Sequence, residues 1–171
     1  MASAYTLSAG EATYVPNAWT TTWPSAITGP STFATEAAAH TGVRVVTGPG
    51  GPVPRAFEQG TLAVIDLLHL NEGWNSYRAR QIEPAVAKRA IALLGQILGA
   101  STPAPAVVPR VRGGIQFEWH GSEVEIEIYI SEQGVVDFYA GTVGGQGGGA
   151  PFEGPLSGNE PELLGWLGRL A

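Results

Sequence analysis

The sequence contains no cysteine. This absence excludes a disulfide framework, a cysteine nucleophile, an iron–sulfur cluster and any zinc site with cysteine ligands. Charged residues are also scarce, at 14% of the 171 residues, against about 25% in a typical soluble domain. The formal net charge of −6 argues against binding nucleic acid or membranes through bulk positive charge.

Long apolar runs are missing as well. No stretch approaches the ~18 consecutive apolar residues that a membrane span needs. The first residues have no basic segment followed by an apolar one, which a secretion signal would require. We therefore expect a cytoplasmic protein that makes no membrane contact.

Glycine and proline, by contrast, are abundant, and the composition changes near Pro54. Residues 1–54 carry only three charged side chains but five aromatic ones. Disordered segments are usually poor in aromatics, because they have nothing to bury. The pattern predicts an irregular N-terminal arm that docks on a surface through side chains such as Trp19 and Trp23. One strand is expected within it, over residues 43–46.

Residues 55–171 form the expected compact domain. Apolar residues at helical spacing predict a helix over residues 55–70. A second helix is expected to begin at Pro84 and to end at Gly99. Proline is favoured in the first turn of a helix, and glycine is common where a helix ends. Between Gly99 and the next strand, the proline-rich residues 101–109 are typical of an extended linker.

Strict alternation of apolar and polar residues over 115–120, 124–130 and 135–140 predicts three antiparallel strands with one buried face and one polar face. Asn159 and Glu162 have the spacing of a capping box at the start of a last short helix. The expected fold class is α+β: two helices, a three-stranded antiparallel meander and a C-terminal helix, preceded by the irregular arm.

The polar face of this meander is rich in carboxylates. Like charges on neighbouring strands destabilise a sheet by tenths of a kcal/mol each, so something must offset them. Water together with Arg110 and Arg112 is one explanation, a basic partner that covers the face is a second, and a metal ion is a third. The carboxylates are Glu118, Glu123, Glu125, Glu127 and Asp137.

Catalytic motifs are poorly supported. Hydrolysis by two carboxylates needs a shared cleft with the groups about 5–9.5 Å apart, and a flat sheet face is not a cleft. Glu118 with His120 is a pair that could ligate a metal, but the other two histidines have no spacing relation to it. The chain has no nucleophile elbow and no phosphate-binding or dinucleotide-binding motif. We expect no catalytic residue, no metal and no cofactor.

The most informative polar segment is residues 71–83, between the two expected helices. Tryptophan, tyrosine and arginine dominate binding hot spots, which makes this loop a candidate partner-binding segment. The alternative is that Trp74 and Tyr77 plug one end of the core while Asn75 fixes the turn. The candidate residues are Trp74, Asn75, Tyr77, Arg78 and Arg80.

Three segments together resemble a known family. They are GWNSYRARQIEPAVAKRAIALL (73–94), PAVVPRVRGGIQFEWH (105–120) and EVEIEIYISEQG (123–134). Their pattern is similar to a widespread family of small bacterial and phage proteins with the sequence Gly-Trp-Asp/Asn-x-Tyr, then Pro-x-Val-x-Pro, then Gly-Gly-Ile-Gln-x-Glu-Trp and an acidic strand. The resemblance covers about a third of the chain. The family has no established activity, so the resemblance implies a partner-type protein rather than a reaction.

These observations predict a non-catalytic protein–protein interaction module of a bacterial or phage system, of the antitoxin or inhibitor kind. Its partner is a protein, either a basic one or a second copy. The expected contact residues are Trp19, Trp23, Trp74, Asn75, Tyr77, Arg78, Arg80, Glu118, Glu125 and Glu127.

Several alternatives stay open. One is a phage or bacterial assembly component whose N-terminal arm threads over neighbouring subunits. Another is a hydrolase that uses carboxylates or a metal held by Glu118 and His120. Nucleic-acid binding through the arginines of residues 78–112 is disfavoured, because the acidic half of the chain repels phosphates. An acidic decoy that mimics DNA is equally consistent with the charges.

Overall fold

The computed structural model of the protein describes residues 5–7, 12–14, 45–47, 53–145 and 150–170. Its helices are α2 (Arg55–Leu67), α3 (Pro84–Ile97) and α4 (Glu160–Leu167), with a short 3₁₀ turn at Val143–Gly145. Its strands are β1 (Tyr5–Leu7), β2 (Ala12–Tyr14), β3 (Val45–Thr47), β4 (Ala106–Pro109), β5 (Ile115–His120), β6 (Val124–Ile130), β7 (Val136–Thr142) and β8 (Phe152–Pro155).

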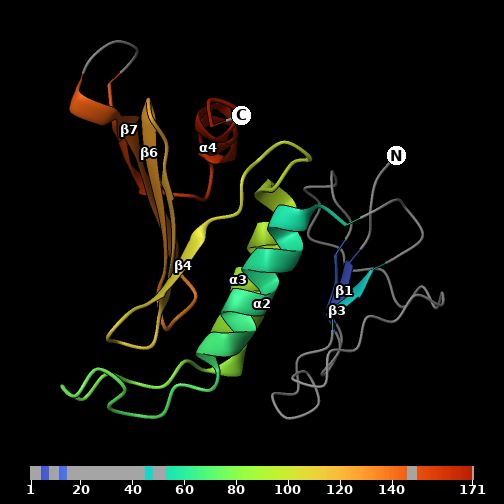
Figure 1. The fold of residues 1–171 in the computed structure, drawn as a ribbon, viewed down its shortest axis with the longest axis vertical. Coiled ribbons are helices and arrows are strands. Elements are labelled where there is room, and N and C mark those ends of the chain that lie inside the picture. The colour runs from blue at the N-terminus through green and yellow to red at the C-terminus, as the bar shows by residue number, and fades with distance from the viewer. Residues whose placement is uncertain (1–4, 8–11, 15–44, 48–52, 146–149, 171) are drawn as a thin grey trace.

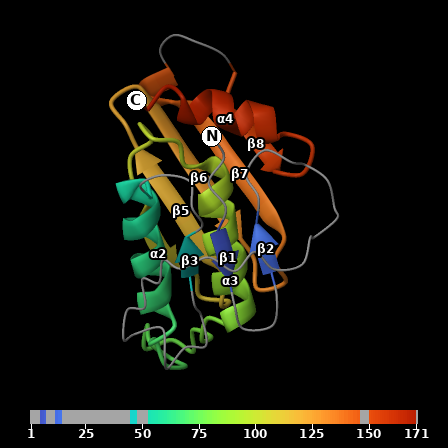
Figure 2. The ribbon, with the colours of Figure 1, turned by 90° about the vertical axis from the view of Figure 1, so that its right-hand side faces the viewer.

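The centre of the fold is an antiparallel sheet of five strands in the order β4-β5-β6-β7-β8. The three helices lie on the same side of this sheet (Figure 1). Seen from the helix side, α2 and α3 run side by side in front of the sheet, and α4 crosses one end of it (Figure 2). The helices therefore cover one face of the sheet and leave the other face open.

The expected three-stranded meander is wrong, although the α+β class is confirmed. The segment expected to be a linker contributes β4, which pairs with β5 from Ala106 opposite Glu118 to Pro109 opposite Ile115. The proline-rich composition is compatible with this, because proline is accepted in strands at a sheet edge. At the other edge, β8 pairs with β7 and has only four residues, too few for an alternating pattern to stand out.

The start of α4 also differs from the expectation. No side chain caps the helix at Asn159; the Asn159 amide donates instead to the carbonyl of Pro155, at 2.8 Å. Glu162 does not return to the cap, because its carboxylate accepts a hydrogen bond from the Trp166 indole at 3.0 Å. The spacing of a capping box is present, but both side chains bind other groups.

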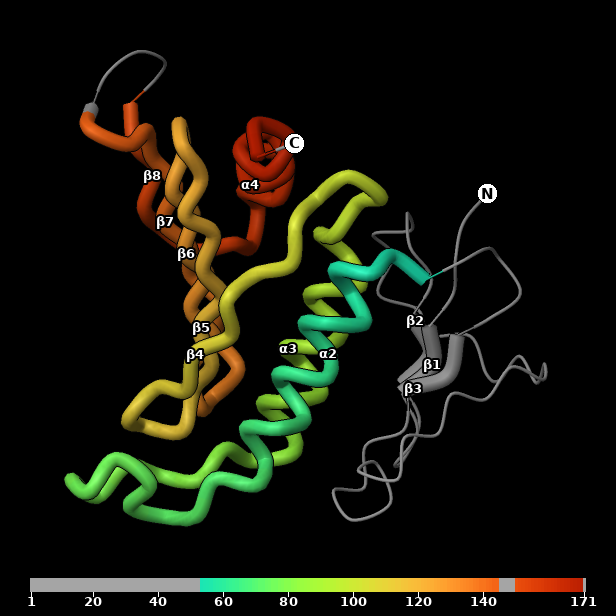
Figure 3. The backbone as a smooth tube through the Cα atoms, viewed as in Figure 1, coloured from blue at the N-terminus to red at the C-terminus, as the bar shows by residue number. Residues whose placement is uncertain are grey.

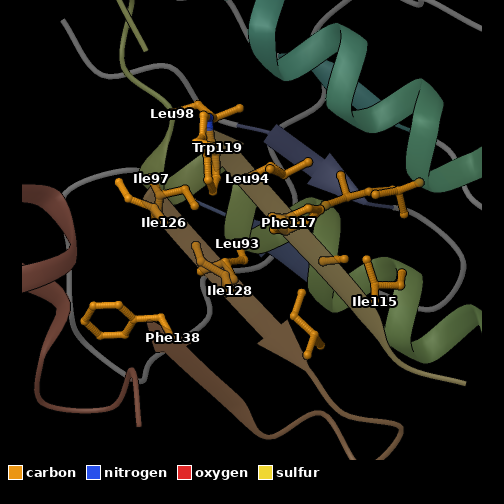
Figure 4. Close-up of a cluster of buried hydrophobic side chains, with 14 of the residues drawn as sticks. Leu93, Leu94, Ile97, Leu98, Ile115, Phe117, Trp119, Ile126, Ile128 and Phe138 are labelled. Carbon is orange, nitrogen blue, oxygen red and sulfur yellow. The ribbon is translucent and has the colours of Figure 1, made fainter. Parts of the chain in front are cut away.

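The core lies between the helix pair and the inner face of the sheet (Figure 4). Alternation along β5 turns Ile115, Phe117 and Trp119 inward, where all three are buried. Burial of each such side chain stabilises the fold by about 1.5–3 kcal/mol. The Trp119 indole keeps its hydrogen bond by donating to the carbonyl of Pro103 at 2.8 Å. The inner residues of the sheet and the facing residues of α3 include Ile115, Phe117, Trp119, Ile126, Ile128, Phe138, Leu93, Leu94 and Ile97.

A second, small sheet is formed by the N-terminal strands in the order β2-β1-β3. Both pairings are antiparallel, with Tyr5 opposite Tyr14 and opposite Thr47. The strand expected over residues 43–46 is present as β3, one to two residues later, while β1 and β2 were not predicted. Trp19 and Trp23, the expected contact residues of the arm, lie outside the described residues.

Candidate functional site

The open face of the sheet carries the outward-pointing residues of its strands. Because successive side chains in a strand point to opposite faces, the residues that alternate with the core form one polar surface. We name this surface the acidic face. No other element of the described part of the chain covers it, and in Figure 1 it looks away from the helices. Its residues are Gln116, Glu118, His120, Glu125, Glu127, Tyr129, Asp137, Tyr139 and Glu153.

The carboxylates of the acidic face are linked by hydrogen-bond donors. The register places Glu118 directly opposite Glu127, an arrangement that repels by itself. The Gln116 amide donates to Glu118 Oε1 at 2.9 Å and to Glu127 Oε2 at 3.1 Å, and so bridges the pair. The Tyr129 hydroxyl donates to the same Glu127 oxygen. Neutral donors thus hold the two carboxylates in place without removing their charge.

The His120 imidazole lies between two carboxylates, those of Glu118 and Glu125. Its Nε2 is 3.3 Å from Glu118 Oε2 and its Nδ1 is 3.1 Å from Glu125 Oε1. A neutral imidazole has only one N–H, so both contacts are hydrogen bonds only when the ring is protonated. The hydrogen bond to Glu118, with the charges of both glutamates, outweighs desolvation and raises the pKa of His120 above its usual 6.5. The sequence alone indicates a solvated histidine at a hairpin turn; the structure places it between two acids.

A titration checks this arrangement. We expect the His120 Cε1–H resonance to titrate with a midpoint above 6.5, and Glu118→Gln to lower that midpoint because it removes the main hydrogen-bonding carboxylate. Since the folded pKa is the raised one, the stabilisation is fully present below pH 6.5 and is lost as the pH rises through the folded pKa. A midpoint that Glu118→Gln and Glu125→Gln both leave unchanged would contradict the assignment.

Tyr129 marks the other end of the acidic face. Burial and the hydrogen bond to Glu127 raise the pKa of its hydroxyl, so the group stays protonated and remains a donor. The guanidinium of Arg110 lies over its ring, 4.7 Å from the centroid, a cation–π geometry. The acidic face therefore has a positive charge at the end where the β4–β5 turn lies.

Among the residues that the structure describes, no set of three or more histidine, aspartate or glutamate side chains is arranged to hold a metal ion. In the same part of the chain, no helix has the length and apolar character needed to cross a membrane.

The second candidate segment is the loop between α2 and α3, residues 71–83, which we name the Tyr77 loop. Asn75 Oδ1 accepts hydrogen bonds from the backbone N–H groups of Tyr77, at 2.9 Å, and Ala79, at 3.1 Å. The backbone N–H of Gly73 donates to the carbonyl of Ala79 at 2.7 Å and closes the loop. The Trp74 indole donates to the carbonyl of Arg80 at 3.3 Å. This network holds the loop in one conformation.

Tyr77 points outward from the loop, with 83% of its surface exposed. The interpretation that Tyr77 plugs the core is therefore wrong, whereas the other aromatic residue of that interpretation, Trp74, is half-buried. The residues on either side, Ser76 and Arg78, have φ angles of 65° and 69°. This left-handed backbone costs a residue other than glycine about 1–2 kcal/mol. Such residues cluster at functional sites.

The Tyr77 loop rests on the turn between β4 and β5. The backbone N–H of Arg80 donates to the carbonyl of Val111 at 2.9 Å. Gly113, with φ +86°, lies so close that a Cβ there would be 3.0 Å from the carbonyl oxygen of Gln81. Val111 is itself 53% exposed. Figure 3 shows the loop under this end of the sheet. Four exposed arginines lie within three residues of Tyr77 or Val111 along the chain: Arg78, Arg80, Arg110 and Arg112.

The predicted site residues that the structure describes therefore fall on two surfaces. Glu118, Glu125 and Glu127 lie together on the acidic face, joined through Gln116 and His120. The five predicted residues between Trp74 and Arg80 all lie in the Tyr77 loop, at the end of the sheet where Arg110 lies.

Gln116 and Tyr129 of the acidic face had no role assigned from the sequence, and His120 was considered only as a metal ligand with Glu118. Gln116, His120 and Tyr129 share the alternation of the glutamates, which is the signal that identifies them as neighbours. Glu153 had no such signal, because its strand was not predicted.

Comparison of the chain with protein-family models, with curated proteins and with solved structures finds no match. The resemblance of residues 73–134 to a bacterial and phage family stays a prediction.

Proposed function

We propose that this protein is a non-catalytic interaction module that docks a basic surface of a protein partner on its acidic face. The observation that carries the proposal is the open face itself, on which partly exposed carboxylates are held in fixed positions. Glu118, Glu125 and His120 keep 22%, 39% and 55% of their side-chain surface accessible. A role of the antitoxin or inhibitor kind accords with an acidic face that binds a basic partner, and the bacterial or phage setting rests on the family resemblance alone.

The edges of the sheet favour docking on the face over strand addition. An added strand needs a row of free backbone groups along an edge. Here both edge strands have four residues. Pro105 precedes β4, which ends at Pro109, and Pro151 precedes β8, which ends at Pro155. Short, proline-bearing edges are how natural sheets resist pairing with another chain.

The fixed hydrogen bonds among the carboxylates of the acidic face favour a binding function over catalysis. Hydrolysis by two carboxylates requires one of them to deliver a proton inside a cleft. Glu118 and Glu127 instead both accept hydrogen bonds from Gln116, and they stand on an uncovered sheet. Because these carboxylate acceptors already have fixed positions, less conformational entropy is lost when a partner binds. The unbalanced negative charge of the acidic face also raises the rate of association with a basic partner.

Capture of partners by matched charge-reversal variants tests the proposal. The face variant is Glu125→Lys with Glu127→Lys, and the control is Glu58→Lys with Asp66→Lys, which reverses two exposed acids on α2. We expect the parent and the control to retain one stoichiometric protein from a lysate of the source organism. The face variant should bind that protein at least about tenfold more weakly.

Salt provides an independent check, because contacts between exposed charges are screened as ionic strength rises. The complex should dissociate at high salt, with the same folded circular dichroism spectrum for all three proteins. Retention of the partner by the face variant would contradict the proposal, as would equal loss of the partner by the control.

A further inference from the structure

His120 is the last residue of β5 and belongs to the acidic face, the surface on which the proposed partner docks. Its imidazole keeps 55% of its side-chain surface exposed, so its proton exchanges with the solvent. Its Nε2 lies 3.3 Å from Glu118 Oε2 on the same strand, and its Nδ1 lies 3.1 Å from Glu125 Oε1 on β6. The ring therefore joins two carboxylates of neighbouring strands, at the end of the face beside the β5–β6 turn.

The charged groups around His120 are almost all negative. None of the outward-pointing residues of β5 to β8 that the structure describes is lysine or arginine, so only His120 among them can carry a positive charge. Residues 101–109, which include β4 on the other side of β5, have no charged side chain. The charged residues of the surrounding elements are Glu118 on β5, Glu125 and Glu127 on β6, Glu123 in the β5–β6 turn and Arg169 after α4, which covers the ring of Trp166 on the helix side of the sheet.

The number of hydrogen bonds that the His120 ring donates depends on its protonation. A protonated imidazole has two N–H groups, and a neutral one has only one. When protonated, His120 donates to both Glu118 and Glu125, and both bonds are charge-assisted. When neutral, it donates to one carboxylate, while its second nitrogen turns a lone pair toward the other. Loss of the proton therefore releases one carboxylate and removes a positive charge from this end of the face.

We propose that His120 is an internal competitor of the partner: its protonated ring occupies the two carboxylates that a lysine or arginine of the partner would bind, and its neutral ring releases one of them. This inference rests on the proposed function, because it describes the regulation of the same docking surface. A cation that binds Glu118 or Glu125 favours the neutral ring, so docking releases a proton. By the same linkage, the partner is bound more tightly as the pH rises through the pKa of His120.

The contacts of His120 set the pH range of this change. The unperturbed pKa of histidine already lies in the physiological range. The hydrogen bond to Glu118, with the charges of both glutamates, raises the pKa of His120 above 6.5. Below the raised pKa the ring is charged and docking is weak, and above it the ring is neutral and docking is strong. This direction is opposite to that of fold stability, to which the protonated ring contributes more.

The free protein tests the release of the carboxylates without any partner. We expect the side-chain carboxyl carbon resonances of Glu118 and Glu125 to shift with the same midpoint as the His120 ring in an NMR titration. In His120→Gln, whose side chain is neutral at every pH, this step should disappear. Carboxyl resonances that show no step at the His120 midpoint, or that keep the step in His120→Gln, would overturn the inference.

An octa-arginine peptide is the basic probe for docking, with its affinity measured by calorimetry at low ionic strength. Because a single exposed ion pair changes affinity by a small factor, we expect the parent to bind the peptide about three- to fivefold more tightly at about pH 8.5 than at about pH 5.5. His120→Gln should lose this dependence and bind tightly at both pH values. His120→Lys should bind weakly at both, because the lysine ammonium stays charged over this range.

The matched control is His69→Gln, which replaces an exposed histidine that follows α2 and is not part of the acidic face. This variant should keep the pH dependence of the parent. A parent with the same affinity for the peptide at both pH values overturns the inference, as does a parent that binds no peptide at either. Retention of the full pH dependence by His120→Gln overturns it as well.

The outcome is separable from that of the proposed function. If the face variant of the capture experiment loses its partner, but the parent binds that partner equally well at both pH values, docking on the acidic face stands and competition by His120 falls. If the peptide binds the parent and the Glu125→Lys, Glu127→Lys variant alike, the acidic face is not the docking surface. The proposed function then falls together with the inference.

Discussion

Replacing Phe117 by alanine is expected to lower the free energy of unfolding by about 3–5 kcal/mol. Phe117 is 0% exposed and lies in the middle of β5, where its ring meets that of Trp119 edge-on at 6.4 Å. Its removal leaves a cavity between the sheet and α3 that neighbouring side chains fill only in part (Figure 4). Since domains of this size are stable by about 5–15 kcal/mol, the loss is a large share of the total.

Urea denaturation followed by tryptophan fluorescence measures this loss, since Trp119 is buried in the same cluster. The matched control is Val135→Ala, in the turn before β7, where the side chain is 56% exposed; its effect should stay within about 0.5 kcal/mol. Equal urea midpoints for Phe117→Ala and the parent would show that the sheet does not pack as described.

The second large effect is expected from Gly114→Ala. A Cβ at Gly114 would overlap the carbonyl oxygen of Ile130 on the neighbouring strand. Ile130 is paired with Ile115, the next residue in the chain, so relief requires the two strands to separate. We expect a loss of about 3 kcal/mol, in the upper range for overpacking.

Gly165→Ala is the control for this prediction, with the opposite sign. Gly165 lies inside α4, and a Cβ there would meet nothing within 4 Å. Alanine in a helix is favoured over glycine by about 0.5–1 kcal/mol, so this variant should be more stable than the parent. Thermal unfolding of the two variants distinguishes crowding at residue 114 from a general effect of replacing glycine; a Gly114→Ala protein as stable as the parent would contradict the strand contact.

The sequence predicted those parts of the fold in which the spacing of apolar residues shows which side of a strand or helix is buried. Alternation over β5 and β6 identified both the inner residues and the acidic outer ones, because each strand has one covered face. Pro84 marked the first turn of α3, where a missing N–H costs nothing.

The parts that it did not predict depend on partners distant in the chain. Strands β4 and β8 have four residues each, so their pairing follows from the neighbouring strand rather than from their own pattern. The contact of His120 with Glu125 depends on the register of β5 and β6, which their turn sets. Tyr77 is exposed between two residues with left-handed backbone, Ser76 and Arg78. Serine and arginine rarely adopt this conformation, so their presence in the sequence does not predict it.

The backbone at Ser76 and Arg78 also restricts how this gene can diverge. Glycine, asparagine and aspartate are accepted at such positions, while β-branched residues and proline are disfavoured. Replacement of Arg78 by glycine would therefore keep the backbone of the loop while removing the guanidinium, whereas valine or isoleucine at the same position would disturb the backbone that holds Tyr77 outward.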